Sequence, residues 1–290
     1  MESYEVRFLE CLDLRGVSRE TKYNYIRPVT SLASYYGQDP GTLSIEQVRT
    51  YFVYLHNVKH YSPQSLKSAY YGIRFFYIHV IGFRQEDFTF FKAKIEHKLP
   101  VILTREEVRM IISRIHSYDY RLLLNLTYQC GLRISEAVRI KIADINRELM
   151  TITVRQSKGN KDRSIPLPEK LYQELREYWK THQNRQLLFP SRSTRQADFN
   201  RMTTLNPISV QTLRSALKSA LKETRIPKHV TCHTLRHSYA THLLEAGVSI
   251  IIIKDLLGHE SLRATMVYVH LTNVSREQSC KIINELMNKM

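Results

Sequence analysis

Apolar residues recur at helical spacing through most of residues 1–95. The period predicts a first helix over 2–15 and a second over 18–37. Two more helices are expected to begin after Ser44, which opens a capping box, and after Ser62, which is followed by a proline at the first helical position. Four helices with short connections predict a small, all-α N-terminal domain.

A charged stretch with no periodic apolar face separates this domain from the rest of the chain. The stretch ends at Pro100, and a second capping box follows at Thr104–Glu107. We therefore expect a linker over residues 96–103 and a second domain over residues 104–290.

The second domain is predicted to be mostly helical with a small amount of strand. Residues 150–155 and 163–167 alternate apolar and polar side chains, which is the period of a half-buried strand. A Gly-Asn turn between them predicts a β-hairpin with Lys158 and Lys161 at its tip. Helices are expected over 105–116, 119–130, 135–141, 168–182 and 209–224, and further helices are expected to end at Gly247 and Gly258.

The net charge of the chain indicates what kind of partner it binds. The chain has 43 Lys and Arg residues against 27 Asp and Glu, which gives a net charge of +16 and an isoelectric point near 9.7. Residues 1–98 carry a net charge of +3 and residues 99–290 carry +13. Such an excess favours a polyanion, and the absence of a polybasic tail or lipidation signal favours nucleic acid over an acidic membrane surface.

Cysteines and apolar runs indicate the compartment. The four cysteines are far apart and form no CxxC pair, and no secretory signal begins at Met1. No uninterrupted apolar run approaches the 18 residues of a transmembrane helix. We expect a cytoplasmic, nucleoid-associated protein with reduced thiols and no membrane partner.

Three short segments of the second domain hold most of its reactive side chains. They are Gly131-Leu-Arg-Ile-Ser-Glu136, His233-Thr-Leu-Arg-His237 and Leu257-Gly-His259, and Tyr268 follows the last segment. In a helix, His233 and Arg236 share a face, because they are three residues apart. Such residues could simply cap or solvate a core helix, so each segment alone is a weak signal.

Two chemical interpretations of the histidines differ in what they would bind. His233, His237 and His242 could bind zinc, but their spacing puts the third imidazole off the face of the first two, and no HExxH glutamate is present. The alternative is a phosphate site, in which arginine forks and imidazoles stabilise a pentacoordinate transition state and Tyr268 supplies the nucleophilic oxygen. We favour the phosphate site.

The three segments, the hairpin Lys158-Gly-Asn-Lys-Asp-Arg163 and Tyr268 resemble, in order and spacing, the signature of the tyrosine recombinases, or phage integrase family. Residues 1–95 also resemble the family's helical, SAM-like core-binding domain. Chain length and the run Thr234–Leu257 are most similar to the compact recombinases of the chromosome-dimer-resolution type. The resemblance implies a mainly α fold with a small three-stranded antiparallel sheet, and two domains that clamp duplex DNA.

The resemblance also implies site roles on the phosphate. Arg133 and Arg236 would clamp the scissile phosphate, and His259 would hydrogen-bond it. Tyr268 would attack the phosphorus and form a 3′-phosphotyrosine with a free 5′-hydroxyl, without ATP, metal or another cofactor.

Other residues are implied to assist. Lys158 would protonate the 5′-oxygen leaving group, and His233 would assist proton transfer at the tyrosine. Glu136 would support the site by holding His233 or the first arginine of the clamp. Lys161 and Arg163 are expected to contact DNA.

The implied activity is site-specific recombination through a Holliday junction, by four protomers at two partly palindromic sites. A helix over residues 275–290 would either dock into a neighbouring protomer or fold back on its own domain. Topoisomerase IB activity and a catalytically idle architectural protein are the alternatives. The sequence does not give the DNA site, the biological setting, accessory proteins or a role for residues 190–206.

Overall fold

A computed structural model describes residues 4–91, 99–155, 162–192 and 201–269, together with Asn284 and Met287. The chain divides into two compact units, Met1–Lys98 and Leu99–Met290. Each unit is mainly helical, and the second contains a three-stranded antiparallel sheet, which confirms the predicted fold class. Among the described residues, no helix has both the length and the apolar character needed to cross a membrane.

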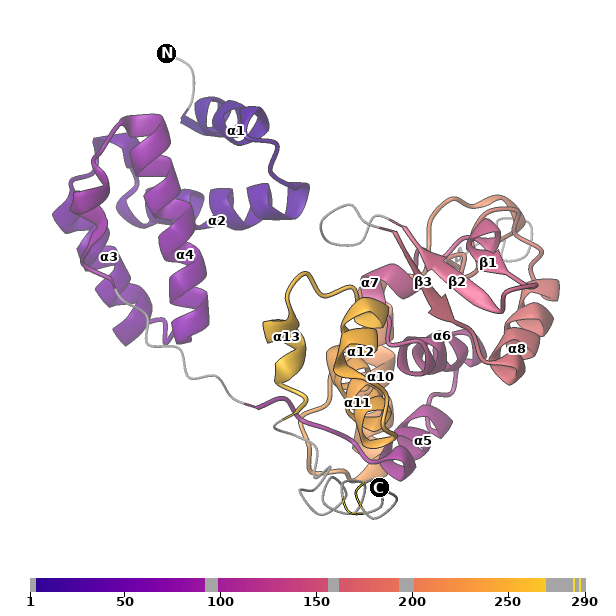
Figure 1. Cartoon of the computed structure of the whole chain (residues 1–290). Helices are drawn as coiled ribbons and strands as arrows, with labels where there is room; N and C mark the ends of the chain where they lie inside the picture. The colour runs from indigo at the N-terminus through magenta and orange to yellow at the C-terminus, as the bar shows by residue number, and fades with distance from the viewer. Residues whose placement is uncertain are drawn as a thin grey trace. The chain divides into compact units, whose positions relative to one another are not determined.

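Over its described residues 4–91, the N-terminal unit has four α-helices and three short turns of other helix types (Figure 1, indigo to purple). The predicted caps are present, since Ser18 accepts a hydrogen bond from the Thr21 amide and Ser44 forms its capping box with Gln47. The elements are α1 (Tyr4–Leu14), α2 (Arg19–Tyr36), η1 (Pro40–Thr42), α3 (Ile45–Asn57), α4 (Pro63–Phe76), the π-helical η2 (Tyr77–Ile81) and η3 (Gln85–Phe88).

Helices α2 and α4 pack closely at the centre of this unit. A Cβ on Gly72 would lie 2.9 Å from the Tyr25 carbonyl oxygen and 2.9 Å from the Pro28 ring, so the helix backbones approach as near as a glycine allows. Most aromatic residues fill the core around them, including the fully buried Phe76 and Tyr77.

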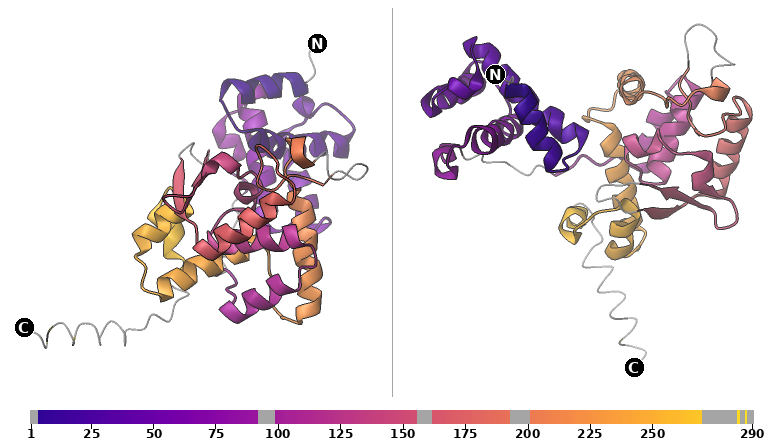
Figure 2. Two further views of the ribbon diagram at one scale, coloured as in Figure 1. Left: turned by 90° about the vertical axis from the view of Figure 1, so that its right-hand side faces the viewer. Right: turned by 90° about the horizontal axis from the view of Figure 1, so that it is seen from above.

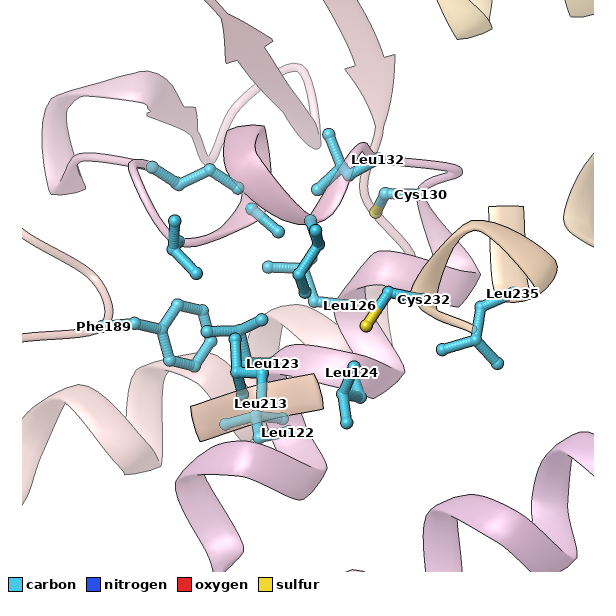
Figure 3. Close-up of a cluster of buried hydrophobic side chains, with 14 of the residues drawn as sticks. Leu122, Leu123, Leu124, Leu126, Cys130, Leu132, Phe189, Leu213, Cys232 and Leu235 are labelled. Carbon is cyan, nitrogen blue, oxygen red and sulfur yellow. The ribbon is translucent and has the colours of Figure 1, made fainter. Parts of the chain in front are cut away.

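The C-terminal unit is built around one buried helix, α6, which contacts α5, α7, α8, α10 and α11. Leucines on several faces of α6 meet Cys130, Phe189, Leu213 and Cys232 in a single hydrophobic core (Figure 3). The helices are α5 (Arg105–Ser113), α6 (Tyr118–Gln129), α7 (Ile134–Ala137), η4 (Ile142–Asp144), α8 (Glu169–Lys180), α10 (Val210–Thr224), α11 (Cys232–Glu245), α12 (Ile250–Leu257) and α13 (Leu262–Met266).

The sheet has the order β1–β2–β3, with β1 over Ile145–Asn146, β2 over Thr151–Val154 and β3 over Arg163–Pro166. Ile152 pairs with Ile165, and both side chains are fully buried, so one face of the hairpin packs on the core. The predicted hairpin tip with Lys158 and Lys161 lies outside the described residues.

Two boundaries differ from the sequence-based expectation. Helix α7 is a single turn rather than a helix to residue 141, because the Ile140 carbonyl and Ile142 amide pair with the backbone of residues 186–188. Leu103, expected in the linker, is fully buried in the second unit, and its amide donates to Ser238 Oγ at 3.0 Å.

Residues 190–206 are held at both described ends by one buried carboxylate. Asp119 is fully buried and forms two ion pairs. Its Oδ2 lies 2.9 Å from Arg192 Nε and 3.5 Å from a terminal nitrogen of Arg201. Arg201 also donates to the Tyr178 hydroxyl at 2.8 Å. These arginines therefore have a structural task that their sequence context did not reveal.

Gly131, at the end of α6, is expected to tolerate no side chain. Its φ is +58°, and a Cβ would lie 2.4 Å from the Tyr239 ring. Gly131→Ala should lower the free energy of unfolding by about 2–5 kcal/mol, from left-handed backbone strain and overpacking together. Gly247→Ala is the matched control, since its φ is +87° but no atom lies within 4 Å of a Cβ. Urea denaturation should show the larger loss for Gly131→Ala, and equal losses would contradict the clash.

Candidate active site

The reactive side chains come from four parts of the C-terminal unit. Arg133 precedes α7, His233 and Arg236 lie on α11, His259 follows α12, and Tyr268 follows α13. Helix α12 contacts α11, α13 and strand β3, and the views in Figures 1 and 2 agree that these elements are neighbours. The fold therefore brings together residues that are up to 135 positions apart in the sequence.

Three arginines meet at the C-terminal end of α12. The last carbonyls of a helix have no partners within the helix and carry its partial negative charge, so they are natural acceptors for cations. The hydrogen bonds run from Arg163 Nε to the Leu256 oxygen (2.9 Å), from an Arg236 terminal nitrogen to the Leu257 oxygen (2.5 Å) and from an Arg133 terminal nitrogen to the Gly258 oxygen (3.4 Å).

Glu136 joins the same arginines from the other side. Its carboxylate accepts from Arg133 at 2.7 Å and from Arg163 at 2.7 Å, and it lies 3.7 Å from Arg236. One carboxylate among three guanidiniums leaves a net positive site. Planar guanidinium forks are suited to the non-bridging oxygens of a phosphodiester, so the arrangement can hold an anion of that kind.

Glu136 was expected to hold His233 or the first arginine, and the structure shows it bonded to Arg133. Arg163 was expected to contact DNA, but in the structure its side chain contacts other groups of the protein. Its side chain is only 8% exposed, and its donors are directed to Glu136 and the Leu256 carbonyl. Its described contacts fix the carboxylate that orients Arg133.

The Glu136 carboxylate, which the arginines share, should make the free energy of unfolding depend on pH. Burial alone would raise the pKa of Glu136, but hydrogen bonds and charges from Arg163 and Arg133 outweigh burial and lower the pKa to about 2. This contribution is complete above the ordinary carboxyl pKa of 4.5 and is lost as the pH falls from there towards 2.

Glu136→Gln should therefore cost about 3 kcal/mol of unfolding free energy at pH 7, and the difference from wild type should shrink below pH 4.5. Urea denaturation at several pH values measures this. The control is Glu177→Gln, whose ion pair with Lys180 is exposed and should contribute less than about 1 kcal/mol. A pH-independent difference for Glu136→Gln would contradict the charge argument.

The histidines of the site lie beside the arginines, with His259 half-buried and His233 exposed at the surface. His259 Nδ1 lies 2.9 Å from Thr265 Oγ1, and its ring stacks on that of Tyr268 with centroids 6.4 Å apart. Burial first, and then the charges of Arg236 and Arg133, lower the pKa of His259 to about 4. The same causes lower the pKa of His233. Both imidazoles are therefore neutral at physiological pH.

Tyr268 is 1% exposed and packs in a small apolar cluster with Ala240, Ile253 and Leu257. Its hydroxyl lies 2.9 Å from Nδ1 of His237. His233 was expected at the tyrosine, but among the described side chains the hydrogen bond to Tyr268 is made by His237. Sequence reasoning considered His237 only as a zinc ligand, although its position one helical turn after His233 places both on one face.

Predictions were also made for Lys158, Lys161 and the tail over residues 275–290. These residues lie outside the described part of the chain, apart from Asn284 and Met287 in the tail. Arg133, Glu136, His233, Arg236, His259 and Tyr268 all lie within the described part, and all belong to the C-terminal unit.

Two family models match most of the chain. Residues 102–274 match the model described as the phage integrase family, and residues 6–87 match the phage integrase N-terminal SAM-like domain. The chain belongs to the phage integrase family. Members of this family are tyrosine recombinases, so the chain is an enzyme that carries out site-specific DNA recombination.

Individual relatives in the phage integrase family match over most of their length. A putative integrase/recombinase of Sinorhizobium fredii, y4qK, is 35% identical over 269 residues, which covers 91% of this chain and 83% of the relative. Tyrosine recombinase XerA of Pyrococcus furiosus is 33% identical over 285 residues, 97% and 94% of the two chains. This integrase is therefore of the compact Xer type.

A solved integrase structure shares the fold. The Tn1549 transposon integrase in complex with circular intermediate DNA matches with a TM-score of 0.70 over 98% of this chain and 99% of that chain, at 18% identity. The agreement spans both domains of the integrase fold.

Proposed function

We propose that the recombinase breaks and rejoins DNA by attack of Tyr268 on a scissile phosphate clamped by Arg133 and Arg236. The observation that carries this proposal is the convergence on one helix end of three arginines with a single carboxylate, next to a buried tyrosine whose ring stacks on His259. The arginine charges replace those that a metal ion would supply in stabilising the pentacoordinate phosphorus.

The proposed step exchanges one phosphoester for another. The Tyr268 oxygen bonds to phosphorus, the bond to the 5′-oxygen breaks, and the product is a 3′-phosphotyrosine with a free 5′-hydroxyl. Lys158 gives a proton to the leaving oxygen, and His259 hydrogen-bonds the phosphate. His233 assists proton transfer at the tyrosine in this proposal, and its ring centroid lies 6.2 Å from that of His237.

The proposed substrate is duplex DNA with two partly palindromic sites, occupied by four protomers that exchange strands through a Holliday junction. Support comes from the +13 charge of residues 99–290 and from the DNA-bound integrase that has the same fold. Contact of the 275–290 tail with a neighbouring protomer, DNA contact by Lys161, and location with the nucleoid complete the proposal.

Trapping on a nicked suicide substrate tests the chemistry. Inverted repeats found beside the gene supply the duplex, and EDTA is present throughout. We expect a protein–DNA adduct that survives denaturant, attached at the 3′ side of the break. Absence of any adduct while the duplex is bound would favour an architectural protein.

A supercoiled plasmid with two sites tests recombination itself. Recombinant circles are the expected product. Relaxation of the plasmid without recombinant circles would favour a topoisomerase instead.

A further inference from the structure

The hydroxyl of Tyr268 has one described polar partner in an apolar setting. The ring is enclosed by Ala240, Ile253 and Leu257, and the hydroxyl lies 2.9 Å from His237 Nδ1. The two rings are 5.7 Å apart at an angle of 51°, so the imidazole meets the hydroxyl at its edge. The apolar cluster therefore directs the hydroxyl to a single imidazole.

A phenol attacks phosphorus poorly until its proton is removed. Burial raises the pKa of Tyr268 above 10, and the charges of Arg236 and Arg133 offset only part of that rise. Free phenolate is thus scarce at neutral pH, and the proton must pass to a group within hydrogen-bonding distance during the attack. Among the described side chains, His237 meets that condition.

We propose that His237 takes the proton of Tyr268 as the tyrosine attacks, and that it is therefore a catalytic residue of the recombinase. This inference rests on the proposed role of Tyr268. The proton moves from the phenol oxygen to Nδ1, the oxygen bonds to phosphorus, and the 5′-oxygen leaves with a proton from the general acid. In rejoining, the 5′-hydroxyl gives its proton back to the general acid as its oxygen bonds to phosphorus, the bond from phosphorus to the Tyr268 oxygen breaks, and the imidazolium of His237 returns the proton to the tyrosine.

Neighbouring charges couple this transfer to DNA. The groups that act on the His237 ring are His233 and Arg236 from α11, Tyr268 from the segment after α13, and His259 after α12. Burial and the first two of these lower the pKa of His237 to about 4, so the imidazole is neutral and able to accept a proton. A bound phosphodiester adds a negative charge that stabilises the imidazolium, so proton transfer to His237 becomes less unfavourable when DNA is in place.

The test is single-turnover cleavage of the nicked suicide substrate by His237→Ala and His237→Gln. Glutamine can still hydrogen-bond Tyr268 but cannot take its proton. Both variants should form adduct about 10²–10⁴-fold more slowly at pH 7, and their rates should rise with pH as hydroxide replaces the lost base. DNA affinity and the urea midpoint are measured for each variant, so that loss of fold is separated from loss of proton transfer.

The same helix provides a matched control. His242 Nδ1 lies 2.9 Å from the hydroxyl of Tyr128 on α6, so α11 contributes to a second, part-buried histidine–tyrosine pair of the same length away from the three arginines of the site. His242→Ala should leave the cleavage rate within a factor of about three of wild type, because the imidazole that it removes is not bonded to a reacting atom.

A modified substrate distinguishes the base from the general acid. A 5′-bridging phosphorothiolate has a thiolate leaving group that departs without a proton, so it relieves the loss of an acid but not the loss of a base. The defect of His237→Ala should persist on this substrate. Relief by the phosphorothiolate, wild-type rates in His237→Gln, or faster cleavage by either variant would each overturn the proposal, the last by showing that His237 restrains the tyrosine. Failure of the proposed function is a separate result, namely a wild-type protein that forms no adduct.

Discussion

Replacing Tyr268 with phenylalanine is expected to abolish the covalent adduct while leaving DNA affinity unchanged. The variant keeps the ring that packs against Ile253 and Leu257 and loses only the oxygen that we propose as the nucleophile. Removal of a nucleophile leaves no alternative route to the intermediate, so the rate of adduct formation should fall by at least about 10⁴-fold. Gel electrophoresis under denaturing conditions after incubation with the nicked substrate measures the adduct.

Tyr239→Phe is the control for this experiment. Tyr239 belongs to α11, packs against the same apolar cluster and, like Tyr268, has a pKa raised by burial. Its variant should form adduct at the wild-type rate. An adduct in Tyr268→Phe would assign the nucleophile to another residue.

The second large effect is expected at Arg236. Its guanidinium is held by the carbonyls of Gly131 and Leu257, and it stays charged because its pKa, although lowered to about 10 by burial and by Arg133, is far above neutrality. Loss of a preorganised charge at the phosphorus should slow cleavage by about 10²–10³-fold. Affinity for uncut duplex should change far less, since the chain has 43 Lys and Arg residues and many of the others can neutralise the DNA backbone.

Two substitutions separate chemistry from folding. Arg236→Ala leaves two buried carbonyls without a donor and should lower the urea midpoint, whereas Arg236→Lys keeps the charge and loses the fork. Both should cleave slowly per folded molecule. Arg109→Ala, whose side chain is 78% exposed, is the control with normal cleavage. A rate within threefold of wild type in both Arg236 variants would remove Arg236 from the phosphate.

The sequence predicted elements better than it predicted contacts. Helices α2 and α4, the hairpin of β2 and β3, and the helix ends at Gly247 and Gly258 were predicted because periodicity and capping are local properties. Helix α7 was predicted too long because its stop is a tertiary pairing with residues 186–188, which no local pattern records.

In the candidate site, too, the residues could be predicted from the sequence but their contacts could not. Arg133, Arg236 and Tyr268 could be chosen from order and spacing, because the family signature is a set of side chains. The partner of Glu136 could not, because Arg163 had the sequence appearance of an exposed hairpin cation and is in fact buried against that carboxylate. His237 was missed because its role depends on where the Tyr268 hydroxyl lies, and the fold alone determines that.

The end of α12 also bears on how such a site can change over generations. The acceptors that align three arginines there are peptide oxygens, which every amino acid provides, so the side chain at Leu256 is free to vary without loss of its hydrogen bond to Arg163. Among the three residues that provide these oxygens, Gly258 is the one whose backbone restricts the choice of residue, because its φ is +64°. Two homologues could thus differ at the position of Leu256 and still hold their arginines identically, whereas insertion of a single residue would move all three acceptors at once.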